Sequence, residues 1–308
     1  NMNDKNFSLL VLGEALIDLV QQADGTFLPL LGGSPYNLCC AAAMQGAEVG
    51  YFNPFSSDTF GRSLLSCLVK AGGQPLSRAS AYPTSLSIVT LNNGQPSYGF
   101  YREGIADRDY CVGTLLSFLE HHPPAVLHTG SLMLIPPDHE KLIPILEHAK
   151  NRGWIISVDL NARPKIAKDL DTYRDALWLV TNYADWLKAS DEDLQFMGFE
   201  NTAIDNAEQI SQVFQAKGCQ RIALTFGAKG AYLRVDDVCG FGDTPKIEVV
   251  DTIGAGDVFW ATCLVDWLSD LGCFQTQFFV ENTLDRALRA AAITCTRTGC
   301  VPPNADEL

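Results

Sequence analysis

The sequence predicts an α/β protein in which helices cover a doubly wound, mainly parallel sheet, with a small β-sheet lid beside it. Three patterns lead to this fold class. From residue 125 onward, apolar strand-like runs alternate with segments of helical spacing. The run 7–12 is continuously apolar, which is typical of a strand buried on both faces. Residues 85–101 alternate around Asn93-Gly94, which is a strong hairpin signal.

The first third of the chain is expected to supply one part of the main sheet and the whole lid. Gly32-Gly33 should precede a helix, because Pro35 suits a first helical turn. Asp58 is a natural N-cap for a second helix that runs to Ala71. Strands are expected at 7–12, 48–52, 85–91 and 96–101, with a hairpin turn at 21–25.

The remainder of the chain continues as alternating strands and helices. Strands are expected at 125–128, 155–159, 185–189 and 221–225. Helices are expected at 138–151, 169–177, 203–216, 256–269 and 283–298. No internal repeat or linker interrupts this order. We therefore expect a single domain that spans 1–308, with a lid formed by roughly 15–31 and 84–104 inserted in it.

Composition and charge limit the classes of partner. The chain has 308 residues, 47% hydrophobic residues and a formal net charge of −14. This acidic balance argues against binding to nucleic acid or to an anionic membrane surface. No apolar run approaches the roughly 18 residues that a membrane span needs. The ten cysteines show no C-x-x-C spacing and no signal peptide is apparent, so we expect reduced thiols and a cytoplasmic protein.

The segment Asp251-Thr-Ile-Gly-Ala-Gly-Asp257 carries the strongest functional signal. It runs directly into an apolar segment of helical spacing, so Gly254, Ala255 and Gly256 should lie at a helix N-terminus. Unpaired N–H groups and the positive end of the helix dipole would form an anion site suited to phosphate. Asp257 puts a carboxylate beside that site, where it can act as a general base. The alternative is a turn followed by an ordinary first-turn aspartate.

Further polar residues follow predicted strands, where ligands bind in open α/β sheets. Asp18 follows the first strand, although it could equally be a solvated edge residue. Asn37 could turn its amide toward a polyol beside Gly32-Gly33, whose backbone a ligand can approach closely. Arg102, at the end of the lid hairpin, could reach a ligand or remain a solvated edge arginine.

Two loops at strand ends complete the set of candidates. The loop Asp159-Leu-Asn161-Ala-Arg163 places a carboxylate, an amide and a guanidinium close together in the chain. The segment Thr225-Phe-Gly227-Ala-Lys229-Gly230 predicts a glycine hairpin. Whether this hairpin also borders a nucleotide stays open at this level.

In their order along the chain, these motifs resemble the ribokinase-like (PfkB) family of carbohydrate kinases over nearly the whole length. The Gly32-Gly33 element, with Asn37, Gly46 and 58–61, is similar to the N-terminal signature of the family, and 251–257 is similar to the C-terminal one. Within the family the chain is most similar to fructokinases. That likeness rests on Gly13-Glu-Ala-Leu-Ile-Asp18, Phe100-Tyr-Arg-Glu-Gly-Ile-Ala-Asp107, Asp159-x-Asn-x-Arg163 and Lys188-Ala-Ser-Asp-Glu-Asp-Leu194.

The resemblance implies a role for each motif. Asp257 would be the catalytic base, and Gly254, Ala255 and Gly256 would form the anion hole for the transferring phosphoryl group. The residues implied to bind the sugar are Asp18, Gly32, Gly33, Asn37 and Arg102, with Arg163 near the sugar or the phosphates. The residues implied to border ATP are Lys188, Thr225, Gly227, Gly230, Ala287 and Leu288.

The resemblance also implies metal ions and a partner subunit. Many relatives organise Mg²⁺ through an N-x-x-E motif, and the matching positions here are Lys188 and Asp191 rather than Asn182 and Asp185. Because aspartate is shorter than glutamate, Asp191 is expected to reach Mg²⁺ through water. A monovalent cation such as K⁺ would lie at Asp251, Ile253, Thr294, Arg297, Gly299 and Pro303. A homodimer that forms through the lid is implied as well.

The leading hypothesis is ATP-dependent phosphorylation of a small sugar, D-fructose to fructose 6-phosphate, by in-line transfer with Asp257 as base. The lid would exclude water and protect ATP from hydrolysis. The nearest alternative is a kinase for 2-keto-3-deoxygluconate, a nucleoside or another sugar. A non-catalytic sugar-binding regulatory protein on the same fold is a third hypothesis.

Overall fold

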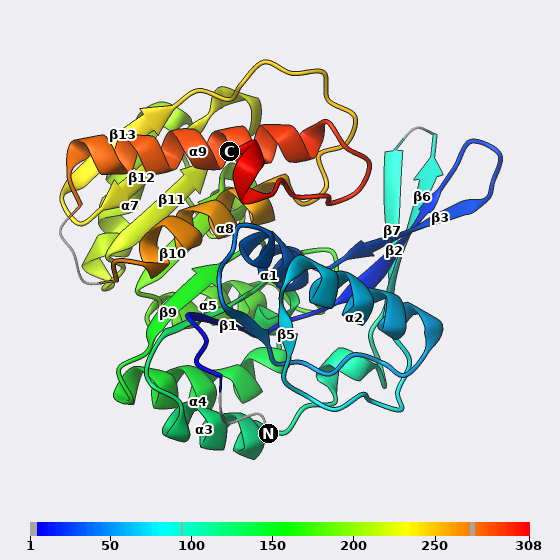
Figure 1. Cartoon of the computed structure of the whole chain (residues 1–308). Coiled ribbons are helices and arrows are strands. Elements are labelled where there is room, and N and C mark those ends of the chain that lie inside the picture. The colour runs from blue at the N-terminus through cyan, green and yellow to red at the C-terminus, as the bar shows by residue number, and fades with distance from the viewer. Residues whose placement is uncertain (1–4, 94, 272–274) are drawn as a thin grey trace.

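In the part of the chain that the structure describes, residues 5–93, 95–271 and 275–308, nine strands form one central sheet (Figure 1). In this computed structural model the strands follow the order β13 (Val238–Gly242), β12 (Ala231–Val235), β11 (Arg221–Thr225), β10 (Trp186–Ser190), β9 (Ile155–Asp159), β8 (Val126–Gly130), β1 (Leu9–Val11), β4 (Val49–Tyr51) and β5 (Gln74–Pro75). Neighbours pair in parallel, except that β12 is antiparallel to β11 and β13. The predicted mainly parallel sheet is confirmed.

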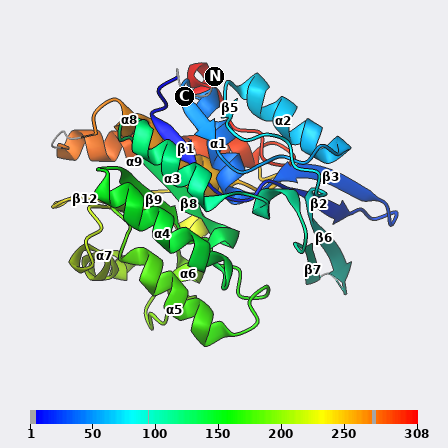
Figure 2. The same ribbon diagram turned by 90° about the horizontal axis from the view of Figure 1, so that it is seen from below.

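Helices cover both faces of this sheet. Those on one face are α1 (Ser34–Met44), α2 (Thr59–Ala71), α8 (Ala255–Leu268) and α9 (Gln277–Cys295). Those on the other face, seen from below in Figure 2, are α3 (Val112–His121), α4 (Asp138–Asn151), α5 (Leu170–Thr181), α6 (Asp191–Phe196) and α7 (Ala207–Ala216). Successive side chains of β1 point to opposite faces of the sheet. Leu9 and Val11 pack in the core beneath α1, α2, α8 and α9, and Leu10 packs in the core on the other face. Within the described ranges, none of these helices has the length and apolar character to cross a membrane.

A second, smaller sheet projects from the body as a lid (Figure 1). Its strands follow the order β3 (Phe27–Gly32), β2 (Leu16–Gln21), β6 (Ser85–Asn92) and β7 (Gln95–Tyr101). The pairs β2–β3 and β6–β7 are antiparallel, whereas β2 and β6 run parallel. The lid is therefore two hairpins joined side by side. Gly94 of the predicted Asn-Gly turn lies outside the described residues.

Some element bounds differ from those that the sequence predicts. Helix α9 begins at Gln277 rather than at 283, with Thr276 as its N-cap. Its first turn exposes Phe278 and Phe279, so the buried stripe that makes a helix recognisable is absent from this end of the described helix. Helix α3 was not predicted, and it buries just Leu115 and Leu119 among its described residues.

The strand order places a topological switch point at the carboxyl end of β1. Strand β1 lies between β4 and β8, so the chain moves in opposite directions across the sheet from this point. Open α/β sheets bind their ligands in the crevice outside such a point. Glu14 follows β1 closely, and Ser131 follows β8 directly. This edge, beneath the lid, is where a ligand site is expected.

Asp58 connects helix α2 to the lid. Its Oδ1 accepts hydrogen bonds from the Gly61 N–H (2.7 Å) and from the Thr84 hydroxyl (2.6 Å). Its Oδ2 accepts another from the Thr84 N–H (2.8 Å), directly before β6. The predicted N-cap is confirmed, and the same carboxylate also fixes the start of a lid strand.

We expect Asp58→Ala to lower the free energy of unfolding by about 1–2 kcal/mol, because removing an N-cap side chain costs about this much. Urea denaturation followed by circular dichroism measures the change. Ser66→Ala, on the exposed face of the same helix, is the matched control and should change stability by less than about 0.5 kcal/mol. Equal stability of the two variants would contradict the assigned cap.

Candidate active site

A cavity of about 620 Å³ lies at the switch point, between the lid and the carboxyl ends of the sheet strands. Lid strands β2, β6 and β7 form one wall, and the loops after β1, β8 and β9 form the other. The N-terminus of α8 closes one end. The predicted residues that line the cavity are Asp18, Gly33, Asn37, Arg163, Lys188, Ile253, Gly254, Gly256 and Asp257.

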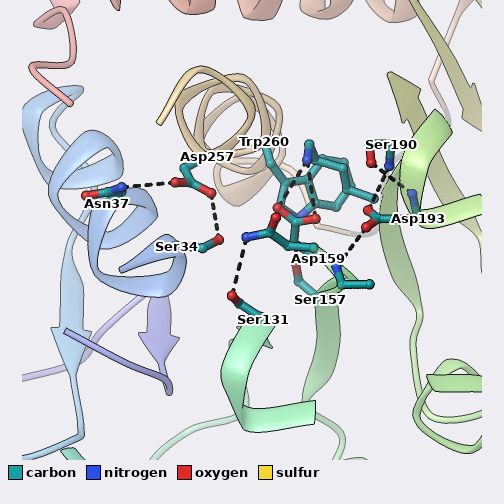
Figure 3. Close-up of polar contacts among 12 residues, drawn as sticks. Ser34, Asn37, Ser131, Ser157, Asp159, Ser190, Asp193, Asp257 and Trp260 are labelled. Carbon is teal, nitrogen blue, oxygen red and sulfur yellow. Dashed lines mark hydrogen bonds and ion pairs between the residues drawn. The ribbon is translucent and has the colours of Figure 1, made fainter. Parts of the chain in front are cut away.

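The carboxylate of Asp257 is held by two side chains of α1 (Figure 3). The Ser34 hydroxyl donates to Oδ1 (2.6 Å), and the Asn37 amide donates from Nδ2 to Oδ2 (3.0 Å). Ser34 and Asn37 are three positions apart, so they project from the same face of the helix. Asn37, expected to contact a polyol, therefore orients the candidate base.

The N-terminus of α8 lies beside Asp257 and has the features of an anion site. Gly254 is its N-cap, in the left-handed region with φ of 78°. A Cβ added to Gly254 would lie 2.3 Å from the Sγ of Cys300, so both backbone conformation and packing require glycine. The first N–H groups of the helix have no acceptor within it, and the positive end of its dipole faces the cavity. Both features favour a bound anion such as phosphate.

Buried hydrogen bonds connect helix α8 to the strands of the central sheet. The helix is apolar around its circumference because it packs between α1, α9 and the strands. The Trp260 indole N–H donates to the hydroxyl of Ser157 on β9 (2.9 Å; Figure 3). That hydroxyl also bonds Nδ1 of His128 on β8 (2.8 Å). Burial, together with the charge of Lys188, lowers the pKa of His128 to about 3, so its imidazole is neutral.

Asp257 is only 8% exposed, and its surroundings make it a stronger base than an ordinary aspartate. Burial raises the pKa of the carboxyl group. The hydrogen bonds from Ser34 and Asn37 oppose this rise, as do the charges of Lys188 and Arg163. A raised pKa brings a carboxylate closer to the range that suits general-base catalysis.

Lys188 lies beneath the N-terminus of α8. Its Nζ contacts both carboxylate oxygens of Asp159, at 3.1 and 3.2 Å, in a buried ion pair. A Cβ added to Gly256 would lie 3.1 Å from this Nζ, so the cation touches the backbone of the anion site. Burial alone would lower the pKa of Lys188, but Asp159 and Asp193 raise it above its ordinary value. The positive charge therefore persists at the floor of the anion site.

Asp18 and Gly32 meet on the lid side of the cavity. Asp18 belongs to lid strand β2, and not to the loop after β1 as its position in the sequence suggested. A Cβ added to Gly32 would lie 2.5 Å from Oδ2 of Asp18, so the glycine makes room for the carboxylate. Burial raises the pKa of Asp18, and a hydrogen bond from Ser87 opposes the rise.

The loop after β9 is held in place by Asp193 of α6. Oδ1 of Asp193 accepts from the Ala162 N–H (2.7 Å), and Oδ2 accepts from the Ser190 N–H (2.9 Å; Figure 3). The Tyr173 hydroxyl accepts from the Arg163 N–H (2.9 Å). These contacts place the exposed Arg163 side chain at the cavity.

The residues expected to border the nucleotide lie beyond this cavity, around β11, β12 and α9. They are Thr225, Gly227, Gly230, Ala287 and Leu288. A Cβ on Gly230 would lie 2.1 Å from the Gly242 carbonyl oxygen, and a Cβ on Gly242 would lie 2.5 Å from Cδ1 of Leu288. The glycine turn and helix α9 therefore both approach Gly242 closely.

The loop before α8 and the loop after α9 are joined by Asp251. Its Oδ1 accepts from the Ile253 N–H and its Oδ2 from the Gly299 N–H, both at 2.9 Å. The carbonyl oxygen of Thr294 accepts from the Arg297 N–H (3.1 Å). The structure thus brings together most of the residues implied for a monovalent cation, with Pro303 buried nearby in the chain.

Arg102 and Asp191 do not line the main cavity. The Arg102 guanidinium donates to Oδ2 of Asp138 (2.9 Å) at the start of α4, which draws it into a second cavity of about 350 Å³. Asp191 begins α6, and its neighbour Glu192 lines the main cavity in its place. Within the described ranges, no group of three or more histidine, cysteine, aspartate or glutamate side chains could hold a metal ion.

Three residues of the site were not singled out from the sequence for the roles that the structure gives them. Ser34 follows the glycine pair at the spacing that pairs it with Asn37, which is a signal available in the sequence. Asp193 follows Ser190 by three positions, which is the spacing of a capping box. Glu14 belongs to the Gly13-Glu-Ala-Leu-Ile-Asp18 segment of the fructokinase likeness, but nothing local in the sequence indicates its surroundings.

A buried carboxylate beside a helix N-terminus, under a lid at a switch point, suits phosphoryl transfer to a small hydroxylated molecule. Comparison with known families agrees: a model described as "pfkB family carbohydrate kinase" matches residues 6–307, and the chain belongs to this family. It is a sugar kinase with the predicted ribokinase-like fold.

Relatives with assigned names cover nearly the whole chain. It is 29% identical to Fructokinase-2 of Zea mays over 310 residues, which covers 96% of this chain and 91% of the relative. It is 30% identical to a fructokinase of Rhizobium leguminosarum bv. trifolii, covering 85% and 80%. The crystal structure of a Xylella fastidiosa fructokinase with bound ATP superposes with a TM-score of 0.83 at 28% identity, covering 97% of this chain and 96% of that one.

We expect kcat/KM for sugar phosphorylation to fall at acid pH. The apparent pKa of this acid limb of the pH–rate profile should lie above the ordinary aspartate pKa of about 3.9. The base must be ionised to accept a proton, and burial raises the pKa of Asp257, so activity is lost as the pH falls through that raised value. Ser34→Ala removes a hydrogen bond that lowers this pKa and should move the limb to higher pH. Initial rates measured across pH test both statements.

Circular dichroism at each pH is the control for this measurement. A carboxyl group whose pKa is raised on folding favours the folded state when it is protonated, so protonation of Asp257 does not itself unfold the protein. An acid limb that stays at the same pH in Ser34→Ala would contradict the assignment of the base.

Proposed function

We propose that this protein transfers the terminal phosphoryl group of ATP to D-fructose, forming fructose 6-phosphate. The observation that carries the proposal is Asp257, a buried carboxylate held by two donors at the first turn of a helix whose N-terminus suits an anion. The maize and Rhizobium relatives are named fructokinases, and the Xylella structure is a fructokinase with bound ATP. These names support both the sugar and the donor.

In the proposed reaction Asp257 accepts the proton of the sugar hydroxyl. The hydroxyl oxygen then attacks the terminal phosphorus while the bond to the ADP oxygen breaks, and the proton stays on the carboxyl group. Such a base typically contributes about 10²–10⁴-fold to the rate. The N-terminus of α8 and the cation of Lys188, which lies close to Gly256, would stabilise the negative charge of the phosphoryl oxygens. Asp18 and Gly33 line the sugar side of the cavity.

We place the adenine side of ATP between the glycine turn after β11 and α9, where Gly227, Gly230 and Leu288 are expected to contact it. Bound Mg²⁺ would neutralise charge on the phosphates. The donors available are Asp191 and Glu192, and Mg²⁺ is commonly held by one or two carboxylates together with substrate phosphates. We place a monovalent cation between the two loops that Asp251 joins.

Two alternatives remain distinct from this proposal. A kinase for a keto-sugar acid would need a cation for the carboxylate, and Arg163 at the cavity could supply one. A non-catalytic sugar-binding protein would need neither an oriented base nor an anion site, and this chain has both. The first alternative is therefore the one to test directly.

We expect ADP release to be fastest with D-fructose in a screen over fructose, other hexoses, 2-keto-3-deoxygluconate and nucleosides. Asp257→Asn keeps the size of the side chain but removes its basicity, so its kcat should fall by roughly 10²–10⁴-fold. Calorimetry should show that this variant still binds the sugar. Turnover retained in Asp257→Asn would overturn the mechanism, and a faster nucleoside or sugar acid would overturn the substrate.

We also propose that the protein is a homodimer and that the lid forms its interface. The lid exposes several large apolar side chains, namely Phe27, Leu28, Leu91, Tyr98 and Tyr101. Leu91 is 58% and Tyr101 is 62% exposed, and both lie on β6 or β7. Exposed apolar groups gathered on one element are typical of a protein–protein interface.

We expect the double variant Phe27→Lys and Leu91→Lys to be monomeric, because charges on the lid would be buried at the interface. Light scattering after size-exclusion chromatography measures the mass. Phe278→Lys, which replaces an exposed aromatic residue far from the lid in the chain, is the control and should remain dimeric. A wild-type protein of monomer mass would rule out the dimer.

We propose a cytoplasmic location because the described cysteines are free thiols. The nine described cysteines are free thiols, as is usual in reducing compartments.

A further inference from the structure

Two cysteines that do not line the main cavity meet between helices α1 and α2, which pack side by side (Figure 1). The Tyr36 hydroxyl of α1 donates to the Leu64 carbonyl oxygen of α2 at 2.7 Å. Cys40 follows Tyr36 by four positions and Cys67 follows Leu64 by three, so each cysteine lies one turn further along its helix. The contact between the helices therefore continues to the two thiols, which lie within hydrogen-bonding distance of each other.

The two thiols differ in their access to solvent. Cys67 is exposed, whereas Cys40 is buried, with 6% of its surface exposed. The ring of Tyr36 packs edge-on against Tyr51 and Phe55, so the hydroxyl beside both thiols is fixed in place. An oxidant from solvent therefore meets Cys67 first, and it does not have to enter the protein to reach Cys40.

The negative charge of this pair resides on Cys67. Of two thiols that share a hydrogen bond, the exposed one ionises more readily, because burial penalises a charge. The hydrogen bond from Cys40 lowers the pKa of the Cys67 thiol to about 6, and Tyr36 and the charge of Lys70 act in the same direction. The same hydrogen bond, together with burial, raises the pKa of Cys40 well above its ordinary value. At neutral pH the pair is a thiolate beside a neutral thiol.

Cys111 offers a comparison within the same chain. It is the other exposed cysteine among the described residues, and it lies at the start of α3. Hydrogen bonds with Thr114 and with the Gly113 N–H lower the pKa of its thiol. The groups that cause this shift include no cysteine. Cys111 is therefore an accessible, activated thiol that lacks the second thiol of the Cys40–Cys67 pair.

We propose that Cys67 and Cys40 form a peroxide-reactive site whose disulfide ties α1 to α2 and slows phosphoryl transfer. An activated, accessible thiol beside a second thiol is the arrangement found in redox-sensing cysteines. Disulfides are rare in reducing compartments, and those that form there are usually transient and catalytic or redox-sensing. The inference goes beyond the proposed function, because it concerns a modification that controls the activity.

The reaction with hydrogen peroxide has two steps. The Cys67 thiolate attacks one oxygen of the peroxide, the O–O bond breaks, and a sulfenic acid forms while the departing hydroxide takes up a proton to become water. The Cys40 sulfur then attacks the Cys67 sulfur, and the hydroxyl group of the sulfenic acid leaves with the Cys40 proton as a second water. The two thiols lose two electrons, which reduce one peroxide to two waters.

The disulfide would act on the catalytic site through helix α1. Bonded sulfur atoms lie about 2.05 Å apart, much closer than two thiols in contact, so α1 and α2 have to shift toward each other. Asn37 lies three positions before Cys40 on α1, and with Ser34 it holds the carboxylate of Asp257. A shift of α1 moves both donors relative to Asp257. A misplacement of about 1 Å can lower the rate of an enzyme roughly a hundred-fold.

The test treats the reduced wild-type protein with hydrogen peroxide, blocks the remaining thiols with iodoacetamide and maps disulfides by mass spectrometry of peptides. We expect a disulfide between Cys40 and Cys67. We also expect kcat for sugar phosphorylation to fall roughly ten- to hundred-fold. Dithiothreitol should reverse both changes, because a thiol reductant restores the two cysteines.

Three variants separate the roles of the cysteines. Cys67→Ser removes the attacking thiolate at an exposed position, so its kcat should not respond to peroxide. Cys40→Ala removes the second thiol without burying a hydroxyl group, so a sulfenic acid should accumulate on Cys67, where dimedone traps it. Cys111→Ser is the matched control, and it should form the disulfide and lose activity as the wild type does. If Cys40→Ala is unstable, Cys67→Ser and Cys111→Ser still decide the outcome.

Each result bears on a different part of the proposal. A treated wild type without a Cys40–Cys67 disulfide, or with Cys67 joined to another cysteine such as Cys300, would overturn the site. A Cys40–Cys67 disulfide with unchanged kcat would overturn the control of activity, as would an equal loss of kcat in Cys67→Ser. A reduced wild type that does not phosphorylate D-fructose would contradict the proposed function alone, because disulfide mapping needs no turnover.

Discussion

The contact between α1 and α8 through Asp257 is the constraint on which the rest of the site depends. Ser34 and Asn37 lie 223 and 220 positions from Asp257 in the sequence, and only the completed sheet brings the two helices side by side. A buried carboxylate without partners would be costly. Two donors on one helix face and the cation of Lys188 offset that cost. The carboxylate of Asp257 is therefore oriented without any bound substrate, as the proposed role of general base requires.

The lid completes the site by covering the switch point. Asp18 is carried by strand β2 of the lid, while Asp257 is carried by helix α8 of the body, so the two carboxylates come from separate parts of the fold. Asp58 caps α2 and bonds Thr84 at the start of β6, which joins the base of the lid to the body. A cavity walled by two sheets can exclude water while both remain individually rigid.

What the sequence predicts well is what local chemistry determines. The anion site follows from glycines directly before an apolar helix, and the N-cap follows from Asp58 at a helix start. The position of Arg102 depends on Asp138, 36 residues away, and the role of Asn37 depends on Asp257. The start of α9 was missed because its first turn exposes aromatic side chains. Partners distant in the sequence are set by topology, which local patterns do not encode.

The charges of the main cavity are arranged along one axis. Lys188, Arg163 and the N-terminus of α8 give the end near the anion site a positive character, whereas Glu14 and Asp18 make the sugar end acidic. A chain with a net charge of −14 repels anions at long range, so a phosphate site would have to be built from local charges such as these. In the proposed reaction the phosphates of ATP lie at the positive end, beside Asp257, and the neutral sugar lies at the acidic end. The same few charges would then separate the two substrates of the proposed reaction.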